Sequence, residues 1–381
     1  MIRHRDSSTR LARAGLAIAA VMAGPRPADA APAGEVTVWP LAPETPIEGA
    51  DEAVRAAGLR PRAFASLRPR LEQEDEAARA AVRAALARVE QELAAARASY
   101  LAQQPDEMLS ALARAEAEAI AALPPGPLCS ATLWEVEFQT GLAYATRKGP
   151  GDAERAAARF ALAWAVDAER RPLSGLYGPD VGLAFVQAVD AATRRPARPV
   201  PIEVAPRDAR VAVDCRPLVV EAGLRPGLHA VRVDAPGHEA SARVVEAETI
   251  AAALPEAPGG LGPWWVAGAL VPTSASARAA VQRFAGTREV VWVEAADGQF
   301  VARRVVDGQP RRVARADSAA GAVRQALAEA GPGPRKADEP RRRTGLWAGL
   351  AGAAVGSLAL GLGLGLGLRE PPEARLQLVV R

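Results

Sequence analysis

The segment 344–368 constrains this chain more than any other, because its 25 residues include no ionisable side chain. As a helix it would reach about 37 Å, which exceeds the bilayer's hydrocarbon thickness of about 30 Å. Arginines 341–343 precede it, and Arg369 and Glu370 follow it. A soluble helix that is apolar on all sides must be deeply buried. We therefore predict a transmembrane helix at 344–368. The alternatives are a Gly/Leu-rich core helix or a low-complexity tail.

The first 30 residues predict a secretory signal peptide. The first 13 residues include five basic ones, Arg3, His4, Arg5, Arg10 and Arg13. Residues 14–24 are apolar, and Ala28 and Ala30 supply small side chains before a cleavage site at Ala31. The alternative is a frayed amphipathic N-terminus.

Export would place the body in the periplasm or outside the cell, with the tail 369–381 inside. The basic residues before the span argue for the opposite orientation. We favour export and keep a tail-anchored cytoplasmic protein as the alternative.

Charge and composition limit the classes of partner. Residues 1–30 contain five of the 47 Lys and Arg residues and two of the 44 Asp and Glu residues, so 42 of each remain after cleavage. Nucleic-acid binding without sequence specificity needs a clustered basic face, and this neutral, dispersed pattern argues against it. Aromatic residues make up only 4 % of the chain, which favours helices that pack through small side chains.

Residues 70–195 are predicted to be α-helical. Leu and Val recur at steps of three and four between 71 and 101, and Pro105 marks a break. Ser130 is the expected N-cap of the next helix, and Asp152 that of the one after it. Residues 71–122 carry a net charge of −5. This predicts a solvated acidic face, or alternatively a docking surface for a basic partner.

Two of these helices carry a combination of small and aromatic side chains. The first has Gly141 and Tyr144, and the second has Ala156, Phe160 and Ala163. This pattern resembles the packing of tetratricopeptide-type (TPR) repeats over about 75–195. The resemblance implies a helical concavity that binds a protein partner. A generic helical bundle is the alternative.

Extended sequence follows a Pro/Arg-rich linker at 196–208. Valines alternate with other residues at 211–214 (VAVD), and turns are indicated at 224–229 (LRPGLH) and 235–238 (APGH). These stretches resemble a PEGA domain, with Cys215 where that family usually has Gly and His238 where it has an aromatic residue. The resemblance implies a small β-sandwich on envelope proteins, with a structural or adhesive role and no catalysis. In that family the residue matching His229 closes the second turn.

A third folded unit is predicted at 275–330. Its Asp-Gly dipeptides, at 297–298 and 307–308, suit type I′ hairpins. They divide the segment into strands at 288–295, 299–306 and 310–315, and helices are expected at 276–285 and 318–330. Trp264 and Trp265 precede this unit in a connector, and we expect them to be buried because exposing two indoles to water is costly.

No catalytic, cofactor-binding or metal-binding residue is predicted. Of the three histidines, His229 and His238 would form with Asp214 only an incomplete metal site, and turn roles are favoured for both. Nucleotide-binding and hydrolase signatures do not occur in the sequence.

Cys129 and Cys215 could form a disulfide between two predicted domains of an exported protein. Two separate buried thiols is the interpretation we favour from sequence.

The sequence thus predicts a multi-domain α+β protein: an α-helical TPR-like domain, a small PEGA-like antiparallel β-sandwich, a small α/β membrane-proximal domain and one transmembrane helix. The predicted segments are a signal peptide (1–30), a strand and linker (31–69), the helical domain (70–195), a linker (196–208), the β domain (209–250), a linker (251–274), an α-β-β-β-α domain (275–330), a spacer (331–343), the span (344–368) and a tail (369–381).

We expect a non-enzymatic scaffold of the bacterial cell envelope that binds the membrane through 344–368 and binds an envelope protein. Paired glycines in the span, such as Gly352 and Gly356, would also permit self-association in lipid. The runner-up is a transmembrane sensor or signalling adaptor, although a tail of 13 residues is too short for a domain. Its segment 375–381 could add a strand to a partner's sheet. A cell-wall-acting enzyme ranks third.

Overall fold

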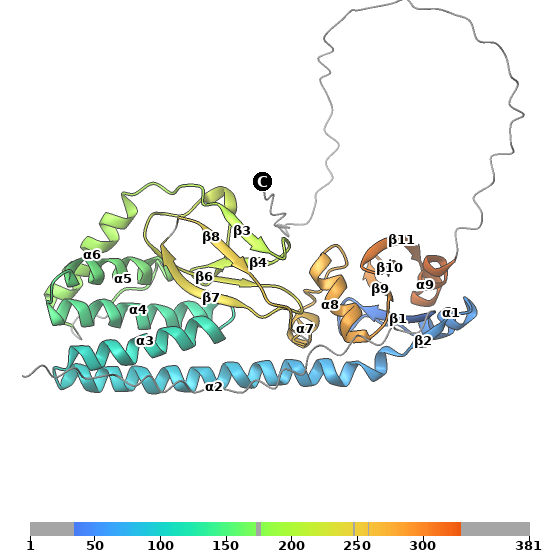
Figure 1. Ribbon diagram of the computed structural model, residues 1–381, viewed down its shortest axis with the longest axis horizontal. Helices are drawn as coiled ribbons and strands as arrows, with labels where there is room; N and C mark the ends of the chain where they lie inside the picture. The colour runs from blue at the N-terminus through green and yellow to red at the C-terminus, as the bar shows by residue number, and fades with distance from the viewer. Residues whose placement is uncertain (1–33, 173–176, 247, 258, 329–381) are drawn as a thin grey trace, which may run out of the picture.

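A computed structural model describes residues 34–172, 177–246, 248–257 and 259–328. They form an α+β protein with a helical region and three small sheets. The body is elongated, with helices and a four-stranded sheet at one end and a five-stranded sheet at the other (Figure 1). The predicted signal peptide, spacer, span and tail lie outside the described residues. Within the described part, no helix has both the length and the apolarity needed to cross a membrane.

The five-stranded sheet joins the two ends of the described chain. Strand β1 (Glu35–Pro40) pairs in parallel with β9 (Glu289–Ala296), with Val36 opposite Glu289. On its other side β1 pairs with β2 (Arg60–Arg62), and beyond β9 lie β10 (Gln299–Val306) and β11 (Gln309–Ala316). We call this unit, residues 34–62 together with 275–328, the α/β module. Everything between β2 and residue 275 is an insertion into it.

The first strand was predicted correctly, but much of the expected linker at 31–69 is structured. It contains β2 and helix α1 (Ala50–Ala56). Helix α1 buries Ala53 and Val54 against the same face of the sheet as α9 (Ala319–Leu327). The Pro-rich stretch that indicated a linker is only the short connection into α1.

The two Asp-Gly turns formed as predicted and produce the β9–β10–β11 meander. Asp297 has φ 52° and Asp307 has φ 49°, the left-handed conformation that a type I′ turn requires. The flanking helices α8 (Ala275–Ala285) and α9 are also confirmed. Ser274 and Ser318 cap their N-termini by accepting backbone N–H hydrogen bonds.

The second face of the sheet is covered by a tryptophan-rich core. Trp39 and Trp292 from the strands pack with Trp265, as do Phe64 and Phe284. Trp265 belongs to α7 (Gly262–Val266), a short helix within the predicted connector 251–274. Trp265 is buried as expected, whereas Trp264, for which burial was also expected, is only partly buried.

Helix α7 also fastens the α/β module to α2 (Arg68–Leu101), the longest helix. Gly262 approaches α2 so closely that a Cβ atom there would lie 2.1 Å from the carbonyl oxygen of Leu71. The carboxylate of Glu74 accepts hydrogen bonds from the backbone N–H groups of Leu261 (2.8 Å) and Gly262 (3.1 Å). Two consecutive donors at the start of α7 are thereby satisfied.

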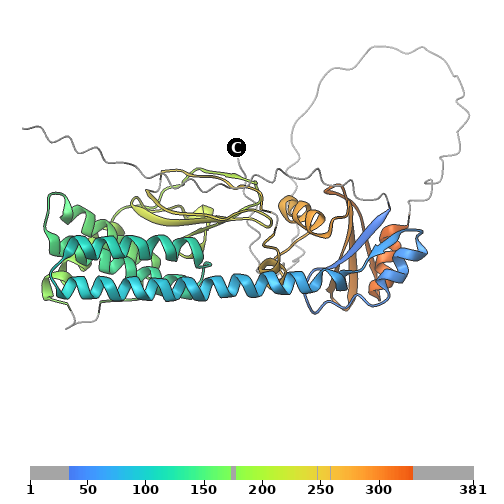
Figure 2. The same cartoon turned by 60° about the horizontal axis from the view of Figure 1, so that its bottom comes forward.

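The 34 residues of α2 give it a length of about 50 Å, and it runs beneath both ends of the body (Figure 2). No residue between 72 and 84 is fully buried. Ion pairs one turn apart, Arg68–Glu72 and Asp75–Arg79, support this exposed part. The helix ends where the sequence predicted a break, and α3 (Pro105–Ala122) begins at Pro105.

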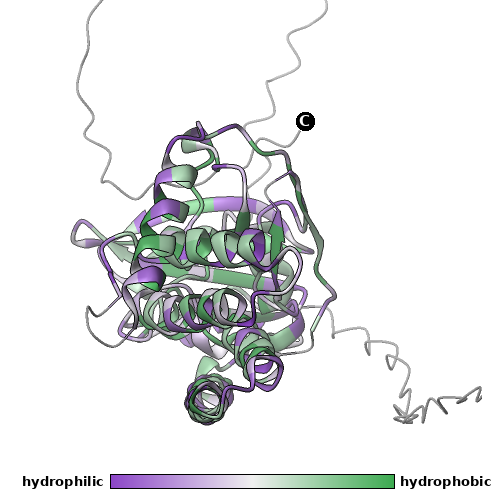
Figure 3. Ribbon diagram, turned by 90° about the vertical axis from the view of Figure 1, so that its left-hand side faces the viewer, coloured by the Kyte–Doolittle hydropathy of each residue, from purple (hydrophilic) through white to green (hydrophobic). Residues whose placement is uncertain are grey.

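Helices α2 to α6 form a stack in which each packs mainly against its neighbours in sequence. After α3 come α4 (Pro127–Arg147), α5 (Asp152–Val166) and α6 (Pro179–Thr193). Viewed from this end, the helices lie in layers (Figure 3). Two predicted caps are wrong, because the N-caps of α4 and α5 are Gly126 and Gly151 rather than Ser130 and Asp152. In α4, a proline at the first turn fixes the earlier start.

The remaining strands form what we call the β module, residues 202–253. Four antiparallel strands run in the order β5 (Arg216–Pro217), β4 (Arg210–Val213), β6 (Leu228–Asp234) and β7 (Ser241–Glu246). Opposite them lie two parallel strands, β3 (Ile202–Ala205) and β8 (Ile250–Ala253), with a valine-rich core between the sheets. Strand β3 lies in the predicted linker 196–208, which is therefore only partly a connection.

The close approach of α4 and α5 gives the first prediction. A Cβ atom on Gly141 would lie 2.5 Å from the ring of Phe160, whereas one on Gly182 in α6 would meet nothing within 4 Å. We expect Gly141→Ala to lower the free energy of unfolding by about 1–3 kcal/mol through overpacking. Gly182→Ala should leave it unchanged or raise it by up to about 1 kcal/mol. Denaturant unfolding followed by helical circular dichroism measures both, and equal effects would contradict the tight packing.

Candidate functional site at the junction of helices and sheet

The four-stranded sheet of the β module packs one face on its own core and the other on the helices. Residues of odd number, such as Val211 and Val231, point to the core shared with β3 and β8. Ala230, one position along, joins the core of the helical region. The helical region and the β module therefore share a buried junction. The disulfide and several buried polar side chains lie in or beside this junction.

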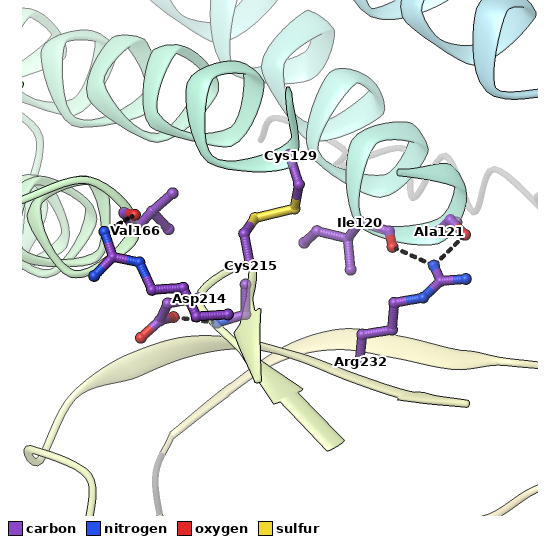
Figure 4. Close-up of a disulfide and its surroundings, with 9 residues drawn as sticks. Ile120, Ala121, Cys129, Val166, Asp214, Cys215 and Arg232 are labelled. Carbon is purple, nitrogen blue, oxygen red and sulfur yellow. Dashed lines mark hydrogen bonds between the residues drawn. A yellow bond between two sulfur atoms is a disulfide. The ribbon is translucent and has the colours of Figure 1, made fainter. Parts of the chain in front are cut away.

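A disulfide crosses the junction. Cys129 in the first turn of α4 is bonded to Cys215 in the turn after β4, with the two Cα atoms 5.7 Å apart (Figure 4). The interpretation of two separate buried thiols is therefore wrong. Beside the disulfide, the backbone N–H of Gly126 donates to the carbonyl oxygen of Cys215 at 2.9 Å. The start of α4 is thus joined to the β module both covalently and by hydrogen bonding.

Two arginines of the sheet lie at the C-terminal ends of helices. Arg232 donates to the carbonyl oxygens of Ala121 (2.9 Å) and Ile120 (3.4 Å) at the end of α3 (Figure 4). Arg216 donates to the carbonyl oxygen of Val166 at the end of α5 (3.4 Å). The last carbonyls of a helix lack partners within it and carry partial negative charge. Positive side chains from the sheet therefore stabilise both helix ends.

The turn that carries Cys215 is held by a carboxylate. Asp214 and Cys215 have φ 52° and 63°, so Cys215 adopts the left-handed conformation for which glycine is usual. Asp214 accepts from the backbone N–H of Ala230 at 3.0 Å and lies 2.6 Å from Nδ1 of His229. The other ring nitrogen of His229 lies 2.8 Å from the carbonyl oxygen of Arg225. Nε2 of His229 thus closes the turn at 225–229, while Nδ1 supports the turn that carries Cys215.

Burial alone would lower the pKa of His229, but the hydrogen bond and the charge of Asp214 outweigh it, so this pKa is raised. A raised pKa in the folded state stabilises the protein below the ordinary value of about 6.5. This stabilisation is lost as the pH rises through the folded-state pKa. The pair therefore fastens the turn more strongly in mildly acidic than in alkaline solution.

A hydrogen-bonded network of one arginine and two carboxyl groups joins three helices next to the junction. Arg159 of α5 lies 2.9 Å from Glu116 of α3 and 2.9 Å from Glu137 of α4. Glu137 is 0 % exposed, and its second oxygen has no hydrogen-bond partner among the described residues. Burial raises the pKa of Glu137 to about 8, because the lost hydration outweighs the attraction of Arg159. At neutral pH Glu137 is therefore mostly protonated.

A second network stands at the far end of the same helices. Arg147 donates twice to the buried Asp152 (2.7 and 2.8 Å) and once to Asp106 (2.8 Å). The backbone N–H of Gly149 donates to Asp152 at 2.7 Å. The hydrogen bonds from Arg147 hold the pKa of Asp152 well below its ordinary value. This carboxylate fixes the tight turn between α4 and α5.

These polar groups serve contacts within the protein, and the structure does not assemble the incomplete metal site considered from sequence. His229 and Asp214 are together, but His238 lies beyond the other end of β6, where its Nδ1 is 3.0 Å from the carbonyl oxygen of Pro236. In the part of the chain that is described, no group of three His, Cys, Asp or Glu side chains is arranged to bind a metal ion.

Sequence reasoning missed the network of Glu116, Glu137 and Arg159. One signal was available, since Glu137 has the apolar neighbours Val136 and Phe138 in the sequence. A carboxylate in such a position must find a partner or be protonated.

Comparisons with protein-family models, curated proteins and solved structures found no match to this chain.

The disulfide gives a prediction that is measured by thiol titration. In the unfolded, unreduced protein we expect no reactive thiol, and two after reduction. Because the bond closes a loop of 86 residues, the double variant Cys129→Ala/Cys215→Ala should lose about 4.6 kcal/mol of unfolding free energy by the chain-entropy model. Two thiols reacting before reduction would contradict the covalent junction.

The raised pKa of Glu137 gives a further prediction. Between pH 4.5 and about 8 the folded protein retains a proton that the unfolded chain releases. The contribution of Glu137 to stability should therefore fall by about 1 kcal/mol for each pH unit in this window. The variant Glu137→Gln keeps the shape of the side chain but removes the ionisable carboxyl group. Unfolding free energies of both proteins from pH 5 to 8 should diverge steadily in favour of the variant, and parallel curves would contradict the assignment.

Proposed function

We propose that this chain is a non-enzymatic, membrane-anchored protein of the cell envelope that acts as a protein-interaction scaffold. One observation carries the proposal. The described chain begins at residue 34 and ends at residue 328 in the same α/β module, whereas α3 to α6 occupy the opposite end of the body (Figure 2). With a membrane anchor at 344–368, the α/β module would be proximal to the bilayer and the helical stack distal.

The contacts between modules suit a scaffold, because they fix the distance between the two ends. Asp208 of the β module accepts from the Ser274 hydroxyl (2.6 Å) and from the Ser276 backbone N–H (2.9 Å) at the start of α8. The guanidinium of Arg210 lies 4.4 Å from the ring centre of Trp264. The β module is therefore attached to the α/β module as well as to the helices, and in our proposal this PEGA-like unit acts as a spacer.

The distal end offers a surface for a protein partner. Helix α6 closes the stack, and it buries Phe185 and Ala188 against α5. Its outer side exposes Leu183 (58 %) and Val186 (52 %). The terminal unit of a helical stack normally presents a polar outer face to water. We take these two apolar side chains, in a TPR-like domain, to be the centre of the partner contact.

Site-specific crosslinking in the producing cells tests this function. A photoreactive amino acid at Leu183 or Val186 should yield a discrete adduct with one other protein. The same group at Val219, which is equally exposed (58 %) in the β module, should not. Leu183→Glu/Val186→Glu should abolish capture of that protein while leaving thermal stability unchanged, since both side chains are exposed. Adducts with no other protein, or capture that survives the double variant, would refute the proposal.

A further inference from the structure

The free edge of the five-stranded sheet is strongly basic. Strand β11 is the last strand of the sheet, and three of its arginines, Arg311, Arg312 and Arg315, are exposed. None of the three has an acidic side chain within 4.0 Å in the described part of the chain. On the neighbouring strand, by contrast, Arg304 lies 2.7 Å from Glu289. Between two of the exposed arginines stands Val313, which is itself 51 % exposed.

The described chain ends at this same edge. The guanidinium of Arg312 donates to the carbonyl oxygen of Ala328, the last described residue. Only the 15 residues 329–343 then separate Ala328 from the predicted span, a reach of at most about 50 Å. They include five further basic residues, against one Asp and two Glu. The basic edge is therefore the part of the body from which the chain continues toward the membrane.

We propose that β11 docks on the anionic phospholipid headgroups of the bilayer that holds the predicted anchor. The proposal rests on the membrane attachment proposed above. Guanidinium groups pair with phosphate oxygens in a bidentate manner. Each basic residue near an anionic surface favours binding about fivefold. Val313, flanked by Arg311 and Arg315, is placed to enter the headgroup layer between the two charges.

The alternative occupant, an added β-strand from another protein, fits this edge less well. Arginine side chains along an edge strand and a proline near its start are features that discourage strand pairing, and β11 has both, with Pro310 as its second residue. A lipid surface needs no backbone hydrogen bonds and gains from every positive charge. Docking would also fix the direction in which the rest of the body points from the bilayer.

The test uses the full chain, reconstituted from detergent into vesicles that contain a lipid-borne fluorescence quencher. Since both native cysteines are disulfide-bonded, Val313→Cys supplies a single thiol for a fluorescent label, and Val219→Cys is the matched control. We expect strong quenching at position 313 in vesicles with phosphatidylglycerol, and little in phosphatidylcholine or at high salt. The control position should show little quenching in any of these vesicles.

Arg311→Gln/Arg312→Gln/Arg315→Gln should lower the ratio of docked to free α/β module about a hundredfold. Arg194→Gln/Arg195→Gln/Arg207→Gln removes the same charge elsewhere and should not.

Flotation of the same samples separates the two proposals. If the chain floats with both vesicle types but position 313 stays unquenched, or is quenched equally in both, the docking surface is refuted and the anchor stands. If the chain floats only with anionic vesicles and only with the three arginines present, the docking surface is supported and the anchor is refuted. Flotation with neither vesicle type refutes both.

Discussion

The parallel pairing of β1 with β9 is the interaction on which the rest of the molecule depends. It joins residues that lie about 250 positions apart, with Val38 opposite Val291 and every paired residue of β1 buried. Parallel strands need cover on both faces, and the cover comes from α1 and α9 on one side and from α7, α8 and the start of α2 on the other. Because the first strand completes the last module, the helices and the β module become one long insertion with both ends fixed in a single sheet.

The sequence predicted those features whose signal is local. Asp-Gly dipeptides fixed both hairpins, Pro105 separated two helices, and Gly141 indicated a close helix contact. It did not predict what depends on distant partners. Residues 35–41 predict a strand, but nothing in them indicates that β9 is its neighbour. Cys129 and Cys215 lay in different predicted domains, and a spacing of 86 residues says nothing about proximity. The sequence positions of charged residues did not predict the buried network for the same reason. Glu137 is buried by the packing of three helices, and a single sequence does not show which helices pack together.

The junction between helices and sheet combines contacts with different dependence on conditions. The disulfide acts mainly on the unfolded chain by limiting its freedom, and it is independent of pH in the folded state. The arginine contacts with helix ends persist at any pH at which proteins are folded, because guanidinium stays charged. Glu137 and the pair of His229 with Asp214 both weaken the folded state as the pH rises. Alkaline solution therefore weakens the contacts of Glu137 and His229, while the disulfide and the arginine contacts continue to hold the helices and the β module together.

The modules are joined by two separate routes, and this explains why segments that looked like linkers are ordered. One route is α2, which leaves the α/β module beside Trp265 and enters the helical stack. The other passes through the β module, which is bonded to α4 by the disulfide and meets α8, where a Cβ atom on Gly237 would lie 2.6 Å from that of Ala280. With a single connection, the α/β module and the helical stack could rotate relative to each other. Two connections on different sides prevent this rotation. The distance between the α/β module and α6 is therefore set by packed helices and strands rather than by the length of Pro-rich linkers.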